Sequence, residues 1–289
     1  MARHSSGSVI YFSMDPEHDR LKFQASRGRR AVTIEQGRNG EKIVLRQGRK
    51  SMDLVWTHLI PATFEGRARM NVQNALAATA ACWAAGAHLH DVRQGLRTFT
   101  TSYYMAPGRL NMFELDGYRV VVDYAHNPPA VRALGEFVDR MTEPSAGGAR
   151  PPVTGRRIGV IATAGDRRDE DIVELGQAAA AYFDEIVVRE DENNRGRPRG
   201  NTAALIEQGI RSADQSRVQM VTIILDELEA TRHALDVARE GDVVVVCVDH
   251  ANQVWKELQR RQHGGASEAD GLRAVIGVMD ADDDVDIDV

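Results

Sequence analysis

The chain has 289 residues, of which 43% are hydrophobic and 27% are charged, a balance typical of soluble globular proteins with one large domain or two ordinary ones. Its net charge is −6, and because the last ten residues contain six aspartates, the rest of the chain is neutral. This balance excludes a general electrostatic attraction to nucleic acid or to a membrane surface, so neither partner is expected.

Two cysteines are present, Cys82 in an alanine-rich helical stretch and Cys247 in an apolar strand-like run. Both are interpreted as small core residues, and neither has the spacing of a metal ligand, so no metal site is predicted within the chain. No apolar run reaches about 18 residues and the start has no apolar signal-peptide core, which indicates a cytoplasmic protein.

Short strands separated by turn residues are predicted for the first 65 residues, as in a β-meander. They are expected at Val9 to Ser13, Lys22 to Ala25, Ala31 to Glu35, Lys42 to Arg46 and His58 to Pro61. Two helices are expected to follow, at about 70–85 and 89–98. The pattern of apolar residues then changes after Pro107-Gly108, which places a domain boundary near residue 106.

Apolar runs alternate with helical patterns from there on, beginning with a hairpin of Leu110–Leu115 and Tyr118–Val122 around the turn Asp116-Gly117. Further strands are expected at 157–161, 185–188, 221–225 and 243–248, and helices at about 129–142, 169–183, 201–213, 226–239 and 251–262. This alternation predicts an α/β fold with a mostly parallel sheet covered on both faces. Residues 143–156 are expected to form a Pro/Gly-rich surface loop.

Polar clusters follow four of these apolar runs, and in an open α/β sheet ligands bind beyond the carboxyl ends of the strands. The clusters begin at Asp123, Thr163, Arg189 and Asp249. Each also has a structural interpretation, because Asp and Asn are common helix caps and charged loops are often only solvated. Their convergence on one edge, with Arg109 carried close to Asp123 by the hairpin, favours a binding site.

Several motifs resemble the Mur ligase family, ATP-dependent ligases that join an amino acid to a carboxylate. These are NVQNALAATAA, APGRLN and VVDYAHNP, and the further runs GDRRDEDI and VREDENNRGR resemble the cyanophycin synthetase branch of that family. The resemblance covers about residues 9–262. It implies a partial Mur central domain at 1–106 and a Rossmann-like Mur carboxyl-terminal domain at 107–265. Residues 266–289 are expected to be an acidic disordered tail.

The resemblance also implies which residues bind ATP. Asn74, and less directly Asn71, correspond to asparagines near the adenine, although a spacing of three residues near a helix start also fits a cap. Arg109 and Asp123 correspond to the pair that holds the nucleotide, with the guanidinium suited to polyphosphate and the carboxylate to ribose hydroxyls. His126 and Asn127 sit beside them in the same set.

The substrate implied by the resemblance is arginine, which this branch attaches to the aspartate β-carboxylate of the polymer cyanophycin through an acyl phosphate. A guanidinium favours planar carboxylate partners, so Asp166, Glu190 and Asp191 are the candidates to bind it, with Arg167 in the same cluster. No catalytic residue is assigned. The family tends toward oligomers, so a homo-oligomer is expected.

The sequence departs from the family in lacking the phosphate-binding motif G-x-x-x-x-G-K-[ST], since none of its four lysines follows a glycine. ATP and Mg²⁺ are the implied cofactors, with most Mg²⁺ ligands expected in a part that precedes this sequence. The chain alone is therefore expected to be a truncated, inactive ligase, or to work only with a separately encoded amino-terminal half.

Two alternatives stay open at this point. One is a non-catalytic module that keeps a nucleotide or amino-acid site, and the other is a different Mur-type amino-acid ligase. GDRRDEDI and the arginine-rich loop after it favour the cyanophycin branch over the second alternative.

Overall fold

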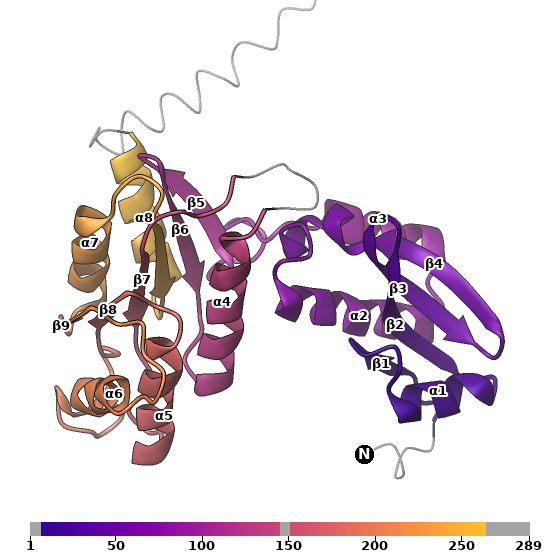
Figure 1. The fold of residues 1–289 in the computed structure, drawn as a ribbon, viewed down its shortest axis with the longest axis horizontal. Helices are drawn as coiled ribbons and strands as arrows, with labels where there is room; N and C mark the ends of the chain where they lie inside the picture. The colour runs from indigo at the N-terminus through magenta and orange to yellow at the C-terminus, as the bar shows by residue number, and fades with distance from the viewer. Residues whose placement is uncertain (1–6, 145–150, 264–289) are drawn as a thin grey trace, which may run out of the picture. The chain divides into compact units, whose positions relative to one another are not determined.

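The computed structural model describes residues 7–144 and 151–263, so the predicted acidic tail lies outside the described residues, as does part of the predicted 143–156 loop. The contacts group the chain into two compact units (Figure 1). The first unit comprises residues 1–105 and 129–153, and the second comprises residues 106–128 and 154–289.

The first unit contains a four-stranded sheet in the order β1-β2-β3-β4. Its strands are β1 (Tyr11–Ser13), β2 (Arg30–Gly37), β3 (Gly40–Gln47) and β4 (Lys50–Trp56). The last three form an antiparallel meander, whereas the short edge strand β1 pairs parallel with β2. Glycines at the β2–β3 and β3–β4 turns allow the tight reversals, and Gly40 and Gly48 both adopt positive φ.

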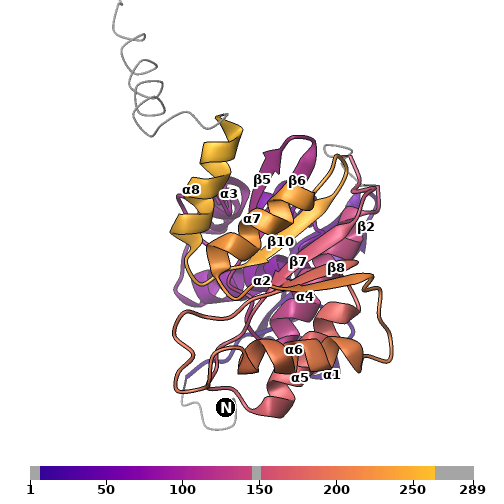
Figure 2. The same ribbon diagram turned by 90° about the vertical axis from the view of Figure 1, so that its left-hand side faces the viewer.

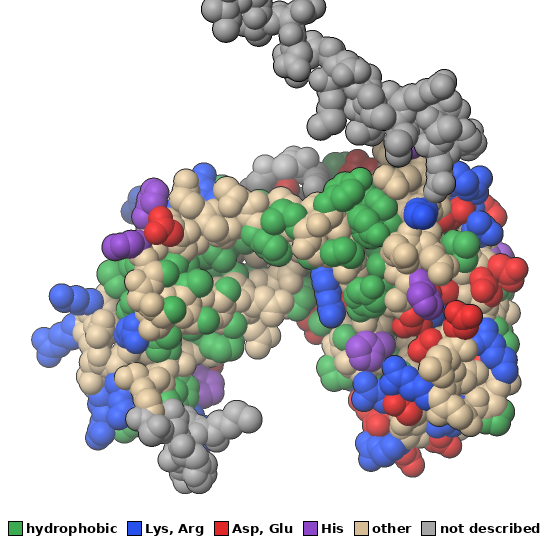
Figure 3. Space-filling view, turned by 180° about the vertical axis from the view of Figure 1, so that it is seen from behind, with side chains coloured by type: hydrophobic (Ala, Val, Ile, Leu, Met, Phe, Trp, Pro, Cys, Tyr) green, Lys and Arg blue, Asp and Glu red, His purple; other side chains and the backbone are tan. Residues whose placement is uncertain are grey.

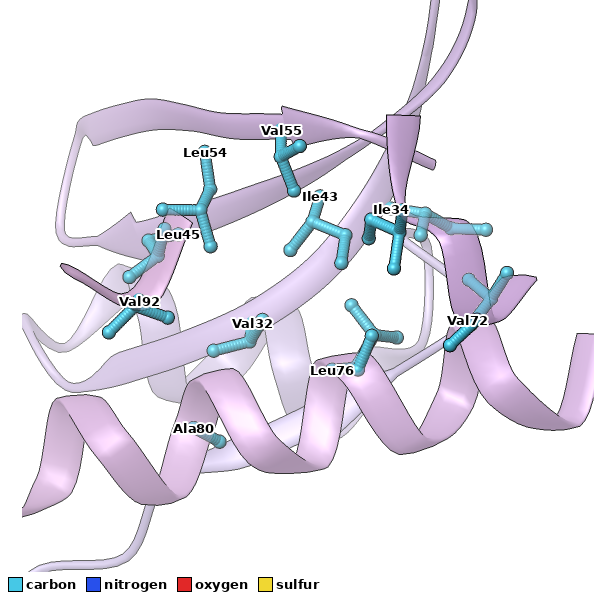
Figure 4. Packing of buried hydrophobic residues seen from close by; sticks show 13 residues of the cluster. Val32, Ile34, Ile43, Leu45, Leu54, Val55, Val72, Leu76, Ala80 and Val92 are labelled. Atoms are coloured by element: carbon cyan, nitrogen blue, oxygen red, sulfur yellow. The ribbon is translucent and has the colours of Figure 1, made fainter. Parts of the chain in front are cut away.

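Helices cover this sheet and bury its apolar residues. They are α1 (Asp19–Ser26), α2 (Arg69–Ala84) and α3 (Leu89–Thr98). Helix α4 (Pro128–Met141), apart from its first residue, is also grouped with this unit. Figure 4 shows Ile34 and Ile43 of the sheet packing toward Leu76 and Val72 of α2. Leu21 and Ala25 of α1 form a separate small cluster with Ala31 of β2.

Two of the predicted strands in this unit are wrong. The predicted strand Lys22–Ala25 is part of helix α1, whose first turn begins with the side chain of His18 accepting from the N–H of Arg20. Leu21 and Ala25 lie one helical turn apart and are both buried, so helical packing overrides the strand-like composition. The predicted strand His58–Pro61 instead forms two 3₁₀ turns, Thr57–Leu59 and Pro61–Thr63.

One strand of the meander was also missed by sequence reasoning. Strand β4 pairs along β3 from Lys50 to Trp56, with a register shift between Ile43 and Val44. Its first four residues are exposed, so its sequence lacks the apolar run that marks the other strands.

The second unit contains a six-stranded, mostly parallel sheet, which confirms the predicted α/β fold class. The strands are β5 (Asn111–Leu115), β6 (Tyr118–Asp123), β7 (Arg157–Ile161), β8 (Glu185–Val188), β9 (Met220–Ile223) and β10 (Val243–Cys247). The order is β5-β6-β10-β7-β8-β9, and only the β5–β6 hairpin is antiparallel. The last strand, β10, therefore lies between β6 and β7, with Cys247 opposite Asp123.

The crossover helices of this unit are α5 (Asp169–Ala180), α6 (Asn201–Arg211), α7 (Glu227–Val237) and α8 (Ala251–Gln262). Because parallel crossovers are right-handed, α5 and α6 lie on one face of the sheet, and α7, which runs back toward β10, lies on the other (Figure 2). Every residue of strands β7 and β10 is buried, as a sheet covered on both faces requires. Among the described residues, no helix is long and apolar enough to span a membrane.

Helices α5 and α6 approach each other at two glycines. A Cβ atom on Gly209 would lie 2.1 Å from the carbonyl oxygen of Val173, and one on Gly176 would lie 2.2 Å from that of Ile206. Both obstacles are backbone atoms, which cannot rotate away as a side chain would. The close packing of these helices therefore requires glycine, which has no Cβ atom, at both positions.

We predict that Gly209→Ala lowers the free energy of unfolding by about 1–3 kcal/mol, because the added methyl group forces α5 and α6 apart. Gly95→Ala is the matched control, since Gly95 is also helical but has nothing within 4 Å of the added Cβ. That variant should gain about 0.5–1 kcal/mol from helix propensity. Urea unfolding followed by circular dichroism measures both, and a Gly209→Ala protein as stable as wild type would contradict the packing account.

Candidate functional site

Arg109 and Asp123 meet at the start of the β5–β6 hairpin. The N–H of Leu110 donates to Asp123 Oδ2 at 2.8 Å, so the residue next to Arg109 is tied directly to the carboxylate. The strand register explains this contact. Asn111 pairs with Val122, so Leu110 and Asp123, which flank that pair, lie opposite each other. Arg109 lies near enough to act electrostatically on the Asp123 carboxyl group.

A tight turn presents the Arg109 side chain. Gly108 adopts φ +66°, and a Cβ there would lie 2.2 Å from the Tyr124 ring, so only glycine fits. The N–H of Tyr124 donates to the carbonyl of Gly108 at 2.9 Å, and the buried side chain of Asn111 holds both Gly108 N and Ala106 O. The exposed Arg109 guanidinium lies over the Tyr124 ring, 5.2 Å from its centroid.

Opposing effects act on the pKa of the Asp123 carboxyl group. Burial raises the pKa of Asp123 above its ordinary value, while the N–H groups of Leu110 and Ala125 and the charge of Arg109 act in the opposite direction. A partly buried carboxylate with fixed N–H partners is suited to accept hydrogen bonds from ligand hydroxyl groups.

The other nucleotide candidates of this unit lie just beyond Asp123. The His126 residue is exposed and its Nδ1 is 2.8 Å from the carbonyl oxygen of Tyr124, so Nδ1 carries the proton and the neutral ring has Nε2 as an acceptor. The carbonyl of His126 accepts from the hydroxyl of Thr163 at 2.7 Å, which ties this loop to the end of β7. Asn127 is half-buried at the start of α4.

Asn71 and Asn74 lie in the other compact unit, on the first two turns of α2. The Asn71 amide donates to the carbonyl of Ala62 at 2.7 Å and accepts from the Asn74 amide at 3.2 Å. Asn71 thus has a structural role near the helix start, whereas the side chain of Asn74 is exposed.

The arginine candidates lie on two loops that follow β7 and β8. Asp166 pairs with Arg195 at 2.8 Å, and this contact lowers the pKa of the Asp166 carboxyl. Arg197 donates to the carbonyls of Gly165 and Arg167, which joins the two loops. Gly165 permits this approach, since a Cβ there would lie 2.2 Å from the carbonyl oxygen of Asn194.

Glu190 and Asp191 are adjacent in sequence but have different environments. The Glu190 carboxylate is buried, and it accepts hydrogen bonds from the Asn194 side chain and from the N–H groups of Gly200 and Ala203 at the start of α6. Glu190 therefore holds the loop and the start of α6 together. Asp191 is half-buried, with one oxygen accepting from the N–H of Asn193.

A network that sequence reasoning did not single out lies beside these loops. The guanidinium of Arg189 is fully buried and donates to Asp249 Oδ2 at 2.6 Å. Glu227, at the start of α7, accepts from the N–H groups of Asp249 and His250, and its Oε2 is 3.0 Å from His250 Nδ1. The sequence feature that could have indicated this network is that Arg189 and Asp249 are charged residues that each follow an apolar run, 185–188 and 243–248.

Among the described residues, no group of three or more His, Cys, Asp or Glu side chains is placed to hold a metal ion. Figure 3 shows acidic and basic side chains intermixed over the second unit, which fits a surface of paired charges.

His250 provides a pH-dependent probe of the network. The hydrogen bond to Glu227 is the largest cause of a raised pKa for His250, so the histidine stabilises the fold at pH values below its unfolded pKa and that contribution is lost as the pH rises through the folded pKa. We predict that Glu227→Gln lowers the His250 pKa toward 6.5, its ordinary value. An NMR titration of the imidazole signals measures this, with Glu229→Gln, on the same helix turn, as a control that leaves the pKa unchanged. An unaltered His250 pKa in Glu227→Gln would contradict the contact.

The sequence of this chain is similar to those of known proteins. A profile of the family described as Mur ligase, glutamate ligase domain, matches residues 108–248, which include the hairpin, Asp123 and the loops of the site. The cyanophycin synthetase of Crocosphaera subtropica is 38% identical over 90% of this chain, and that of Trichormus variabilis is 37% identical over 90%. The chain spans 28% and 27% of the length of these relatives.

More distant relatives share the fold. The UDP-N-acetylmuramoyl-L-alanyl-D-glutamate–2,6-diaminopimelate ligase of Geobacillus thermodenitrificans is 30% identical over 61% of this chain and 32% of its own length. Among solved structures, Escherichia coli FolC in complex with DHPP and ADP aligns with a TM-score of 0.57 and 19% identity, over 88% of this chain and 54% of that one. MurC of Thermotoga maritima aligns with a TM-score of 0.52 and 18% identity, over 81% and 46%. Residues 108–248 therefore form a carboxyl-terminal domain of the Mur ligase family, and over about 90% of its length the chain is a homologue of the cyanophycin synthetases.

Proposed function

We propose that this chain is the nucleotide- and amino-acid-binding part of an ATP-dependent ligase that adds arginine to the aspartate β-carboxylate of cyanophycin. The observation that carries the proposal is the juxtaposition of Arg109 and Asp123 at the carboxyl edge of the second-unit sheet. Similarity to cyanophycin synthetases over 90% of the chain supports the choice of arginine and cyanophycin over other amino acids and acceptors.

The residues of the β5–β6 edge fit a nucleotide. The partly buried Asp123 carboxylate suits ribose hydroxyls, and the exposed Arg109 guanidinium, stacked on Tyr124, suits phosphate oxygens. His126 Nε2 offers an acceptor on the same edge, and we assign Asn127 to the same ligand. Asn74 is kept as an adenine candidate by the resemblance of its motif alone. The FolC structure described above contains ADP, in line with nucleotide use in this fold.

The reaction proposed for the complete enzyme has two steps. The β-carboxylate of aspartate takes the γ-phosphoryl group of ATP, which leaves ADP and an acyl phosphate. The α-amine of arginine then attacks the acyl carbon, phosphate leaves, and the amine loses a proton as the amide forms. The residues of this chain bind and orient ATP and arginine.

The groups that stabilise the transferred phosphoryl group are absent from the printed sequence, which has no G-x-x-x-x-G-K-[ST] motif. Preorganised charges around the γ-phosphoryl group supply most of the rate acceleration in phosphoryl transfer. We therefore expect the isolated chain to bind ligands without turnover and to require a further polypeptide segment for catalysis.

We predict that Arg109→Ala weakens ATP binding by about tenfold, because a charge-assisted contact to phosphate is lost. Arg217→Ala is the matched control, since Arg217 is a half-exposed arginine that pairs with Asp184 at the opposite edge of the sheet. Isothermal titration calorimetry of the purified chain with ATP measures both affinities. Equal losses in the two variants, or none in Arg109→Ala, would contradict the nucleotide site. ATP-dependent incorporation of labelled arginine by the pure chain would contradict the expected lack of turnover.

A further inference from the structure

Arg189 is the largest fully buried side chain among the described residues, with a relative exposure of 1%. It directly follows β8, and its guanidinium reaches past the end of β7 to β10, where Nε and Nη2 donate to the carbonyl of Cys247 at 3.2 and 2.5 Å. Nη1 donates to Asp249 Oδ2 at 2.6 Å and to the carbonyl of Glu190 at 3.3 Å. A buried guanidinium is costly unless its donors are satisfied, and here each of its three nitrogens has a partner.

Asp249 is held by this guanidinium through one oxygen only. Its Oδ2 bonds to Arg189, whereas the structure gives Oδ1 no partner among residues 7–144 and 151–263, and the side chain is 31% exposed. The backbone is fixed as well, because the N–H of Asp249 donates to Glu227 at 2.9 Å. The carboxylate is therefore preorganised, with one oxygen anchored and the other directed toward solvent.

This open oxygen lies on the edge that carries the proposed arginine candidates. Asp249 follows the end of β10, two residues beyond the register partner of Asp123. Both Asp191 and Asp249 act electrostatically on Arg195, the arginine paired with Asp166. Carboxyl groups that follow β7, β8 and β10 thus all act on the exposed guanidinium of Arg195, which shows that this edge attracts a guanidinium cation.

Resting on the function proposed above, we propose that Asp249 is a specificity-determining carboxylate that receives the guanidinium of the incoming arginine, and that Arg189 is its positioning residue. The hydrogen bond from Arg189 Nη1 holds Asp249 Oδ2, which leaves Oδ1 as an acceptor for a second planar, weakly hydrated cation. The same geometry gives no comparable stabilisation to a neutral side chain of the same shape.

Citrulline is the discriminating probe, since it replaces the arginine guanidinium with a neutral urea group of nearly the same size. Titration of the full chain with L-arginine and with L-citrulline, followed by amide chemical shifts, gives both affinities. The wild-type chain should prefer arginine, and Asp249→Asn should weaken arginine binding by about tenfold or more while changing citrulline binding little. The loss of preference between the two ligands is a result that a purely structural role for Asp249 would not produce.

Asp236→Asn is the matched control. Asp236 also pairs with an arginine, Arg261, at 2.7 Å, but it is exposed near the end of α7 that lies away from this edge. The control should keep the preference of the wild-type chain for arginine.

Arg189→Lys tests the positioning role, because lysine keeps the charge but cannot bond to Cys247 and Asp249 with a planar fork. It should reduce the arginine preference with a smaller effect on ATP affinity, and if the variant does not fold, Asp249→Asn decides alone. A wild-type chain that prefers arginine, with Asp249→Asn showing the same preference, would overturn the assignment of Asp249 and leave the proposed function intact. A wild-type chain that binds ATP but shows no preference for arginine would overturn the choice of arginine as substrate, and this assignment with it.

Discussion

The position of β10 in the second unit is the constraint on which the site depends. As the last strand in sequence, it inserts between β6 and β7, so that Cys247 lies opposite Asp123 and the following loop meets the ends of both neighbours. Without this insertion the buried Arg189 would have no carbonyl of Cys247 and no carboxylate of Asp249 to satisfy it. The parallel direction of these strands then gathers their polar loops on a single edge.

Much of this architecture could be predicted from sequence because its strands are buried on both faces. Near-continuous valine runs such as Val243–Val246 have few other interpretations in a soluble chain, and the Asp116-Gly117 turn identifies the β5–β6 hairpin. The first unit was harder, since α1 has little apolar periodicity and β4 begins with four exposed residues. In both cases long-range packing, which no local window reports, decides the structure.

The contacts of the site also differ in how far they could be predicted from the sequence. Arg109 and Asp123 are close in sequence and joined by a hairpin, so their meeting follows from local pairing. Arg189 and Asp249 are separated by 60 residues and by the intervening strand β7, so their contact depends on the strand order of the sheet. For Glu190 the charge in the sequence suggested a ligand, but the environment of its buried carboxylate, which accepts from the N–H groups of Gly200 and Ala203, depends on how α6 begins.

The central claim is that the carboxyl edge of the second-unit sheet binds a nucleotide through the hairpin and the loop after β6. The most direct measurement is a map of amide chemical-shift changes in the full chain on addition of ADP. The account predicts that the largest changes fall at residues 108–111 and 123–127, with smaller ones along the loops after β7 and β10. Saturable changes that spare both segments and cluster elsewhere in the chain would contradict it.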